Sequence, residues 1–200
     1  SSCNEGSHGA AVTFATVLTK ALLGQNRYTL SDGTYYLSST LSPAEKIEIT
    51  GTVTICLNGQ TIQSTAADKP VFEIASGGKR SWTDCRSNTG TVTHSNVTGC
   101  GVEVKKGTFT MYGGEISGNT ANGGGGVAII GSTMVMHDGV ISNNSTYRTS
   151  GQDSYGAGVY VADYANSSGG DTLFTATPAS FEMNGGKITG NKALDYGGGG

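Results

Sequence analysis

Apolar residues alternate with polar residues in short runs along most of this chain. Val102 and Val104 are spaced by two, as are Phe109 and Met111, and Ile116 follows alone. A spacing of two places side chains on one face of an extended strand, whereas these runs are too short and too often interrupted by glycine to be helices. The pattern therefore predicts three short strands within this stretch.

The same pattern returns at a fixed interval. Self-similarity of this period indicates stacked supersecondary units that share one continuous core, and an antiparallel sandwich would not explain a constant interval. A third copy, with insertions, covers residues 158–161 and 181–191. The pairs that lie 25 residues apart include Ile47/Phe72, Val102/Val127, Phe109/Met134, Ile116/Ile141 and Asn119/Asn144.

Three strands per repeat, each turned into the next, make one coil of a parallel β-helix. The next coil then lies one strand spacing away, at about 4.8 Å. We expect an all-β solenoid of about five coils over residues 28–200, in which equivalent apolar residues stack inward as columns. One column should contain Ile62, Val92, Ile116, Ile141 and Ile188, and another Phe109, Met134 and Phe181.

The two ends of the chain depart from this pattern. In residues 8–23 the apolar side chains fall at roughly helical spacing, which predicts an amphipathic α-helix within an N-terminal cap of residues 1–27. Such a helix would cover the apolar cross-section and the unpaired strand edges of the first coil. The last coil reaches Gly200 without a comparable cap, so we expect a fragment that continues past 200.

Composition narrows the classes of partner. The net charge is −3 and only 14% of the residues are charged, so no basic field attracts nucleic acid. No apolar run approaches the ~20 residues that span a bilayer, so no membrane insertion by this segment is expected. Glycine supplies 33 of 200 residues, but the strong strand pattern argues against disorder.

The four cysteines suit an oxidising compartment, and they allow three pairings. No Cys-x-x-Cys spacing occurs, so a zinc site is disfavoured. Cys56 and Cys85 are 29 residues apart, close to the 30 that separate Ile62 from Val92, so they should fall on neighbouring coils near the same bend. We expect a disulfide between them, and two buried thiols are the alternative.

Asparagines recur at one position of the repeat. Asn119, Asn144 and Asn191 each follow an isoleucine by three residues. Asparagine tolerates left-handed backbone, and its amide can hydrogen-bond along a stack of identical residues. The recurrence predicts a structural asparagine ladder at a turn, with a ligand-binding role as the alternative.

Two short motifs resemble those of a known group of repeat proteins. Gly-Gly-x-Ile occurs at residues 113–116 and 185–188, and residues 181–184 match Phe-x-x-Asn. Both motifs resemble those of chlamydial polymorphic outer-membrane proteins, and the whole unit more closely resembles right-handed β-helix repeats in large surface proteins of gut Gram-positive bacteria. Two departures exist, since Asp138 replaces the first glycine of one pair and Tyr112 replaces the asparagine.

This resemblance implies a right-handed, single-stranded parallel β-helix in an extracellular protein, either secreted or on the bacterial cell surface. It implies an adhesin-like, non-catalytic module whose partner is a host glycan or a surface protein. It brings with it no catalytic residue and no cofactor.

An enzyme is the alternative, because parallel β-helices also include polysaccharide lyases and glycoside hydrolases. Glu48, Glu73 and Glu103 share the middle, outward position of the first strand in successive coils and form a candidate cation or sugar site, the alternative being a solvated strand face. Arg80, Lys105 and Lys106 lie close to this column in sequence and would neutralise it. The histidines His8, His94 and His137 occupy no matching repeat positions, so no metal site is predicted.

The repeat lengthens on both sides of the strand at residues 159–161. Val127 and Val159 are 32 residues apart instead of 25, and a longer insertion follows. Aromatic faces stack on sugar rings and on partner side chains, so we expect a binding surface here, with neutral loop drift as the alternative. The candidate ligand-binding residues are Tyr147, Arg148, Tyr155, Tyr160 and Tyr164.

Overall fold

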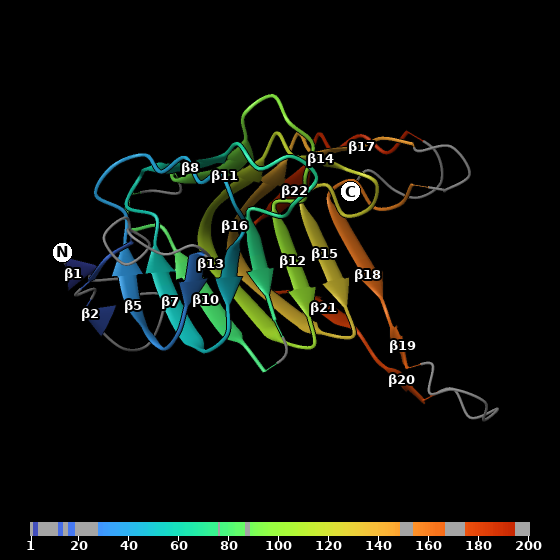
Figure 1. The fold of residues 1–200 in the computed structure, drawn as a ribbon, viewed down its shortest axis with the longest axis horizontal. Coiled ribbons are helices and arrows are strands. Elements are labelled where there is room, and N and C mark those ends of the chain that lie inside the picture. Colours follow the sequence, from blue (N-terminus) through green and yellow to red (C-terminus); the bar gives the residue numbers. More distant parts are fainter. Residues whose placement is uncertain are drawn as a thin grey trace.

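In the computed structural model, the chain is all-β, with parallel strands in stacked sheets and essentially no helix among the described residues (Figure 1). Neighbouring strands of a sheet come from successive repeats, so the colours in Figure 1 run in sequence order along the molecule. This arrangement has the character of a solenoid. The structure describes residues 2–3, 12–13, 16–18, 28–75, 77–86, 89–148, 154–166 and 175–194.

One large sheet contains the first strand of each repeat, and all its pairs are parallel. Val102 pairs with Phe72 on one side and with Val127 on the other, so the 25-residue interval is the register of the sheet. From one edge to the other its strands are β18 (Val159–Ala162), β15 (Val127–Ile130), β12 (Val102–Lys105), β9 (Phe72–Ile74), β6 (Ile47–Ile49) and β4 (Tyr28–Leu30).

The other large sheet contains the second and third strands of the repeats, again in parallel. Its main path runs through β21 (Ser180–Met183), β16 (Thr133–Ser142), β13 (Thr108–Ser117), β10 (Lys79–Thr83), β7 (Thr52–Cys56), β5 (Gly33–Tyr36) and β3 (Thr16–Val17). The strands β8 (Thr61–Ser64), β11 (Thr91–His94) and β22 (Lys187–Thr189) join it beside this path.

Three small sheets complete the described strands. Parallel β14 (Thr120–Ala121) and β17 (Ser145–Thr146) lie at the turn after the asparagines. The antiparallel pair β19 (Tyr164–Asn166) and β20 (Thr175–Thr177) forms a ribbon that projects from the stack, at the lower right of Figure 1. At the N-terminal side, β1 (Ser2–Cys3) pairs antiparallel with β2 (Val12–Thr13).

The core lies between the large sheets and consists of the predicted columns. The isoleucine column is confirmed, because each of its members is the register partner of the next. The column Phe109, Met134 and Phe181 is confirmed in the same way. Phe181 and Ile188 are only partly buried, whereas the earlier members are fully buried. Burial of side chains of this size contributes roughly 1.5–3 kcal/mol each.

The glycine pair of the repeat bends a strand instead of ending it. We expected separate strands around Phe109 and Ile116, but β13 runs through both, with register shifts on either side of Tyr112. Gly114, Gly139 and Gly186, the second glycines of the motif, have φ of 82°, 103° and 84°. Only this second position requires left-handed backbone, which is why an aspartate is tolerated at the first position.

No N-terminal capping helix is seen in the part of residues 8–23 that the structure describes, so that prediction is wrong there. Val12–Thr13 and Thr16–Val17 are extended, and Thr16–Val17 pairs in parallel with Tyr35 and Tyr36 of β5. Two of these residues are valines and two are threonines, which favour strands when a sheet edge is available. Except for these residues and Leu18, the segment lies outside the described part of the chain.

Candidate functional site

The candidate carboxylates and one of the predicted tyrosines share one register row of the first sheet. Glu48, Glu73 and Glu103 are register partners on β6, β9 and β12. The row continues through Ala128 of β15, which is buried, to Tyr160 of β18. The insertion before β18 does not disturb this register, because it leaves the stack between β17 and β18. We call this row and its neighbours the carboxylate–tyrosine face.

Lysines pair with two of the three carboxylates of this row. Lys46 forms an ion pair with Glu73, and Lys105 forms one with Glu103 at 2.9 Å. The side chains of Glu73 and Glu103 are 15% and 19% exposed, so both carboxylates are largely screened from solvent. Like charges on adjacent strands would repel, and the lysines offset that repulsion.

The positive charge on Lys105 is stabilised by its surroundings. Partial burial lowers the pKa of Lys105. The hydrogen bond and charge of Glu103, together with the charge of Glu73, raise this pKa by more than burial lowers it. The net result is a pKa above the ordinary 10.5. Lys105 is therefore a firmly charged partner of the acidic row at neutral pH.

Of the three cations expected to neutralise the row, only Lys105 does so. Lys106 lies instead above the ring of Tyr164, with its ammonium 4.1 Å from the ring centroid. Arg80 points into the core, where it is 2% exposed. The repeat interval did not predict that Lys46 pairs with the row. Lys46 lies one residue before β6, and its ammonium reaches the carboxylate of Glu73 in the next coil.

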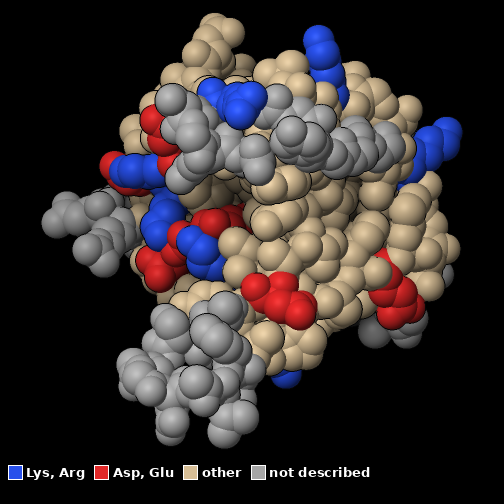
Figure 2. Space-filling model, turned by 90° about the vertical axis from the view of Figure 1, so that its right-hand side faces the viewer, with Lys and Arg blue, Asp and Glu red and all other residues tan. Residues whose placement is uncertain are grey.

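A groove of about 490 Å³ opens beside the acidic row, and it contains a predicted tyrosine. Tyr147 reaches this groove from the end of β17, where its backbone N–H donates to Ala121 O at 3.1 Å. Figure 2 shows acidic and basic side chains intermingled on one flank of the molecule, beside a broad surface without charge. The charged residues of the lining are Lys46, Asp68, Lys69, Glu73, Glu103 and Lys105.

Two further tyrosines extend the face. Tyr155 and Tyr160 stack with ring centroids 6.1 Å apart and an interplanar angle of 19°. Tyr155 is 39% exposed, and its backbone forms an isolated bridge with Gly123, which also lines the groove. Tyr147, Tyr155 and Tyr160 are therefore associated with the same face as the carboxylates.

The remaining two predicted residues lie apart from the groove lining. Tyr164 is on β19 at the base of the projecting ribbon, against Lys106. Arg148 follows Tyr147 and is exposed. The predicted set is thus divided between the carboxylate–tyrosine face and the base of the ribbon.

The three asparagines form a continuous hydrogen-bonded ladder. The backbone N–H and the side-chain amide of Asn119 both donate to Asn144 Oδ1, at 3.0 and 3.1 Å. Asn144 donates to Asn191 Oδ1 in the same way, at 3.0 Å for each bond. Asn119 and Asn144 are fully buried, so their amides serve the turn of the stack and are not available to a ligand.

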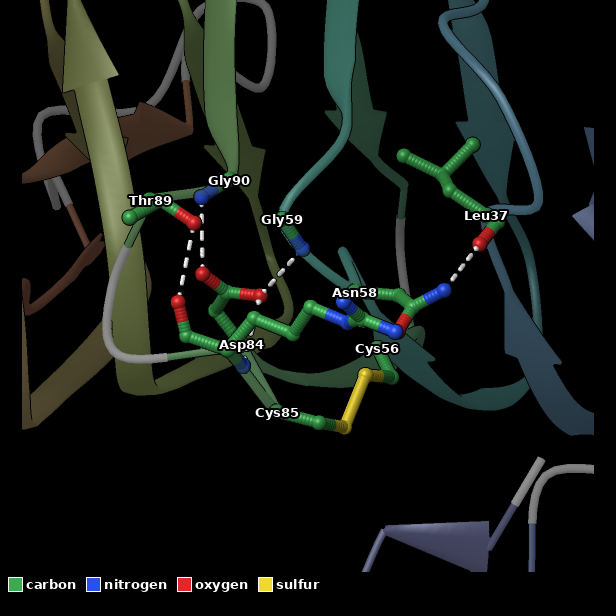
Figure 3. Close-up of a disulfide and its surroundings, with 9 residues drawn as sticks. Leu37, Cys56, Asn58, Gly59, Asp84, Cys85, Thr89 and Gly90 are labelled. Carbon is green, nitrogen blue, oxygen red and sulfur yellow. Dashed lines mark hydrogen bonds between the residues drawn. A yellow bond between two sulfur atoms is a disulfide. The ribbon is translucent and has the colours of Figure 1, made fainter.

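The predicted disulfide lies at a corner of the stack. Cys56 and Cys85 are joined, with their Cα atoms 6.3 Å apart (Figure 3). The adjacent Asp84 accepts hydrogen bonds from the backbone N–H groups of Gly59 and Gly90, at 2.6 and 2.7 Å. The covalent bond and the buried carboxylate together fix the turns of two neighbouring coils.

Comparisons with known proteins add no relative. No family model matches the chain, and no curated protein or solved structure matches it. Among the described residues, no group of three or more His, Cys, Asp or Glu side chains is arranged to hold a metal ion. No described helix has the length and apolar character needed to cross a membrane.

Proposed function

We propose that this chain is a right-handed, single-stranded parallel β-helix module, secreted or on a bacterial cell surface, that binds a glycan or a protein without catalysis. The repeat motifs and the parallel, in-register stacking of three strands per repeat support the fold. The Cys56–Cys85 disulfide supports an oxidising, extracellular compartment.

The observation that carries the proposed function is the register row that joins Glu73 and Glu103 to Tyr160, with Tyr147 lining the groove beside the carboxylates. From Glu73 to Tyr160 the row crosses three strand spacings, about 14 Å. Aromatic rings at one end and ion-paired polar groups at the other are suited to a ligand that needs both stacking and hydrogen bonds. Because lysines balance the carboxylates, the face favours a neutral polar ligand, such as an uncharged glycan, over a highly charged one.

A glycan array followed by titration of the best ligand tests this function. Tyr147→Ala combined with Tyr160→Ala removes the ring that lines the groove and the ring in the register row, and we expect binding at least about tenfold weaker at a nearly unchanged melting temperature. Tyr164→Ala is the matched control, because it removes an equal ring at the ribbon. Undiminished binding by the double variant, or an equal loss in the control, contradicts the proposed site.

A glycoside hydrolase is the second candidate, and one observation favours it. Glu73 and Glu103 are register partners on adjacent strands whose backbones lie about 4.8 Å apart, so their carboxyl groups leave the sheet side by side, as the paired carboxyl groups of a glycosidase must. Against it, each carboxylate is held by a lysine, whereas a general acid must deliver a proton. Release of reducing ends from neutral or acidic polysaccharides, lost in both Glu73→Gln and Glu103→Gln, would replace the binding function by hydrolysis.

A further inference from the structure

The core contains one cation at a position that is apolar in the neighbouring coils. Arg80 of β10 is the register partner of Val53 in one coil and of Phe109 in the next, and all three are buried. A guanidinium group carries five N–H donors and no acceptor, and it stays protonated in proteins. Transfer of such a charge from water into a core is strongly unfavourable unless partners compensate for it.

Aromatic rings supply part of that compensation. The guanidinium carbon lies 3.6 Å from the ring centroid of Phe72 and 4.9 Å from that of Trp82. Trp82 in turn makes edge-to-face contacts with Phe72 and Phe109, at 5.9 and 4.8 Å between centroids. A desolvated cation–π contact is favourable, but an aromatic ring face accepts no conventional hydrogen bond from the guanidinium N–H groups.

Four buried nitrogen atoms at this point have no hydrogen-bond acceptor within the described part of the chain. They are Nε, Nη1 and Nη2 of Arg80 and Nε1 of Trp82. Burial also lowers the pKa of Arg80 well below its ordinary value, because the charged guanidinium is removed from water. All four atoms are donors, so the cluster calls for a species that accepts hydrogen bonds and carries negative charge.

We propose that Arg80 and the indole N–H of Trp82 hold a small monovalent inorganic anion, chloride under ordinary ionic conditions, inside the stack. An anion accepts from both side chains and neutralises the guanidinium at once. A water molecule would accept from them too, but its own hydrogens would then need acceptors, and it would leave the charge uncompensated. The ion would thereby act as a structural part of the core.

Crystals of the protein refolded in bromide test this directly, because refolding lets the ion enter a site that is closed in the native state. We expect an anomalous bromide peak within hydrogen-bonding distance of the Arg80 guanidinium and Trp82 Nε1. No peak at this position, or density without an anomalous signal, overturns the proposal. Bromide peaks elsewhere on the surface do not count toward it.

A solution measurement gives a second, independent answer. At constant ionic strength, replacement of gluconate by chloride should raise the melting temperature until the site is saturated. Trp82 is the only tryptophan of the chain, so refolding in iodide should also quench its fluorescence. Arg80→Met, similar in length and uncharged, should abolish both effects. A melting temperature independent of chloride overturns the proposal, and if the variant does not fold, the bromide crystals decide.

Discussion

His94 Nδ1 lies 2.7 Å from Asn119 Oδ1, so a histidine stands at the head of the asparagine ladder. The orientation of the Asn119 amide is defined by its nitrogen, which donates to Val92 O and Ser117 O, both at 3.1 Å. The other ring nitrogen of His94 lies 3.0 Å from Lys69 O. The buried imidazole therefore connects the ladder to the backbone of the preceding coil.

Truncation in the middle of the ladder should be costly. Asn144→Ala removes the acceptor of the Asn119 backbone N–H and the donor to Ile116 O, at 2.9 Å, so these two buried backbone groups lose those bonds. We expect a loss of about 2–4 kcal/mol in the free energy of unfolding, measured with urea. Ser117→Ala, on the same turn, should change it by less than about 0.5 kcal/mol. Equal effects of the two substitutions would contradict a structural ladder.

The head of the ladder can be tested by comparing two replacements of His94. Asparagine keeps a side-chain donor for Asn119 Oδ1, whereas alanine leaves that oxygen and Lys69 O unpaired. His94→Asn should therefore destabilise the protein less than His94→Ala, by about 1 kcal/mol in the unfolding free energy. If the urea midpoints of the two variants coincide, the bond to Asn119 does not contribute to stability.

The disulfide should stabilise the stack. Closing a loop between Cys56 and Cys85, with a separation of 29 residues, contributes about 3–4 kcal/mol through the entropy of the unfolded chain. Non-reducing peptide mapping should recover one linked peptide that contains both cysteines, and the double variant Cys56→Ala, Cys85→Ala should unfold at lower denaturant concentration. Four titratable thiols in the denatured, unreduced protein would exclude the bond.

The ion pair between Lys105 and Glu103 should make the stability of the protein depend on pH in the alkaline range. The pKa of Lys105 is higher in the folded protein than the ordinary 10.5, so its contribution to stability is fully present below 10.5 and is lost as pH rises through the folded value. Because Lys105 is partly exposed, we expect no more than about 1 kcal/mol. Melting temperatures of the wild type and Lys105→Met should differ at pH 8 and converge toward pH 12. A constant difference would contradict this account.

The thiol of Cys100 should be unreactive in the native protein. Burial, followed by the nearby charge of Glu103, raises its pKa far above the ordinary value, so the reactive thiolate is scarce at neutral pH. Iodoacetamide at pH 8 should leave the Cys100 peptide unmodified until urea is added, as mass spectrometry of the digest would show. Rapid alkylation of the folded chain would indicate that this turn opens readily.

The sequence by itself determined the strands and their register. Alternation along a strand and a constant interval between repeats are one-dimensional properties, and parallel stacking converts them directly into columns such as Ile62, Val92 and Ile116. The same reasoning located the Asn119–Asn144 pair and the Cys56–Cys85 bridge, because both depend on equivalent positions in neighbouring coils.

Only the tertiary structure decided what the interval alone does not show. His94 lies on the interval, 25 residues before Asn119, but it is not an asparagine, and only the structure shows that its ring bonds to the first asparagine of the ladder. The row from Glu103 to Tyr160 crosses an insertion, and strand pairing, not residue number, restores the register after it. Thr16–Val17 could satisfy either period in sequence, and the available edge of β5 makes it a strand. For the row and for Thr16–Val17, hydrogen bonds between segments distant in sequence set the position, and such bonds leave no periodic signal in the chain.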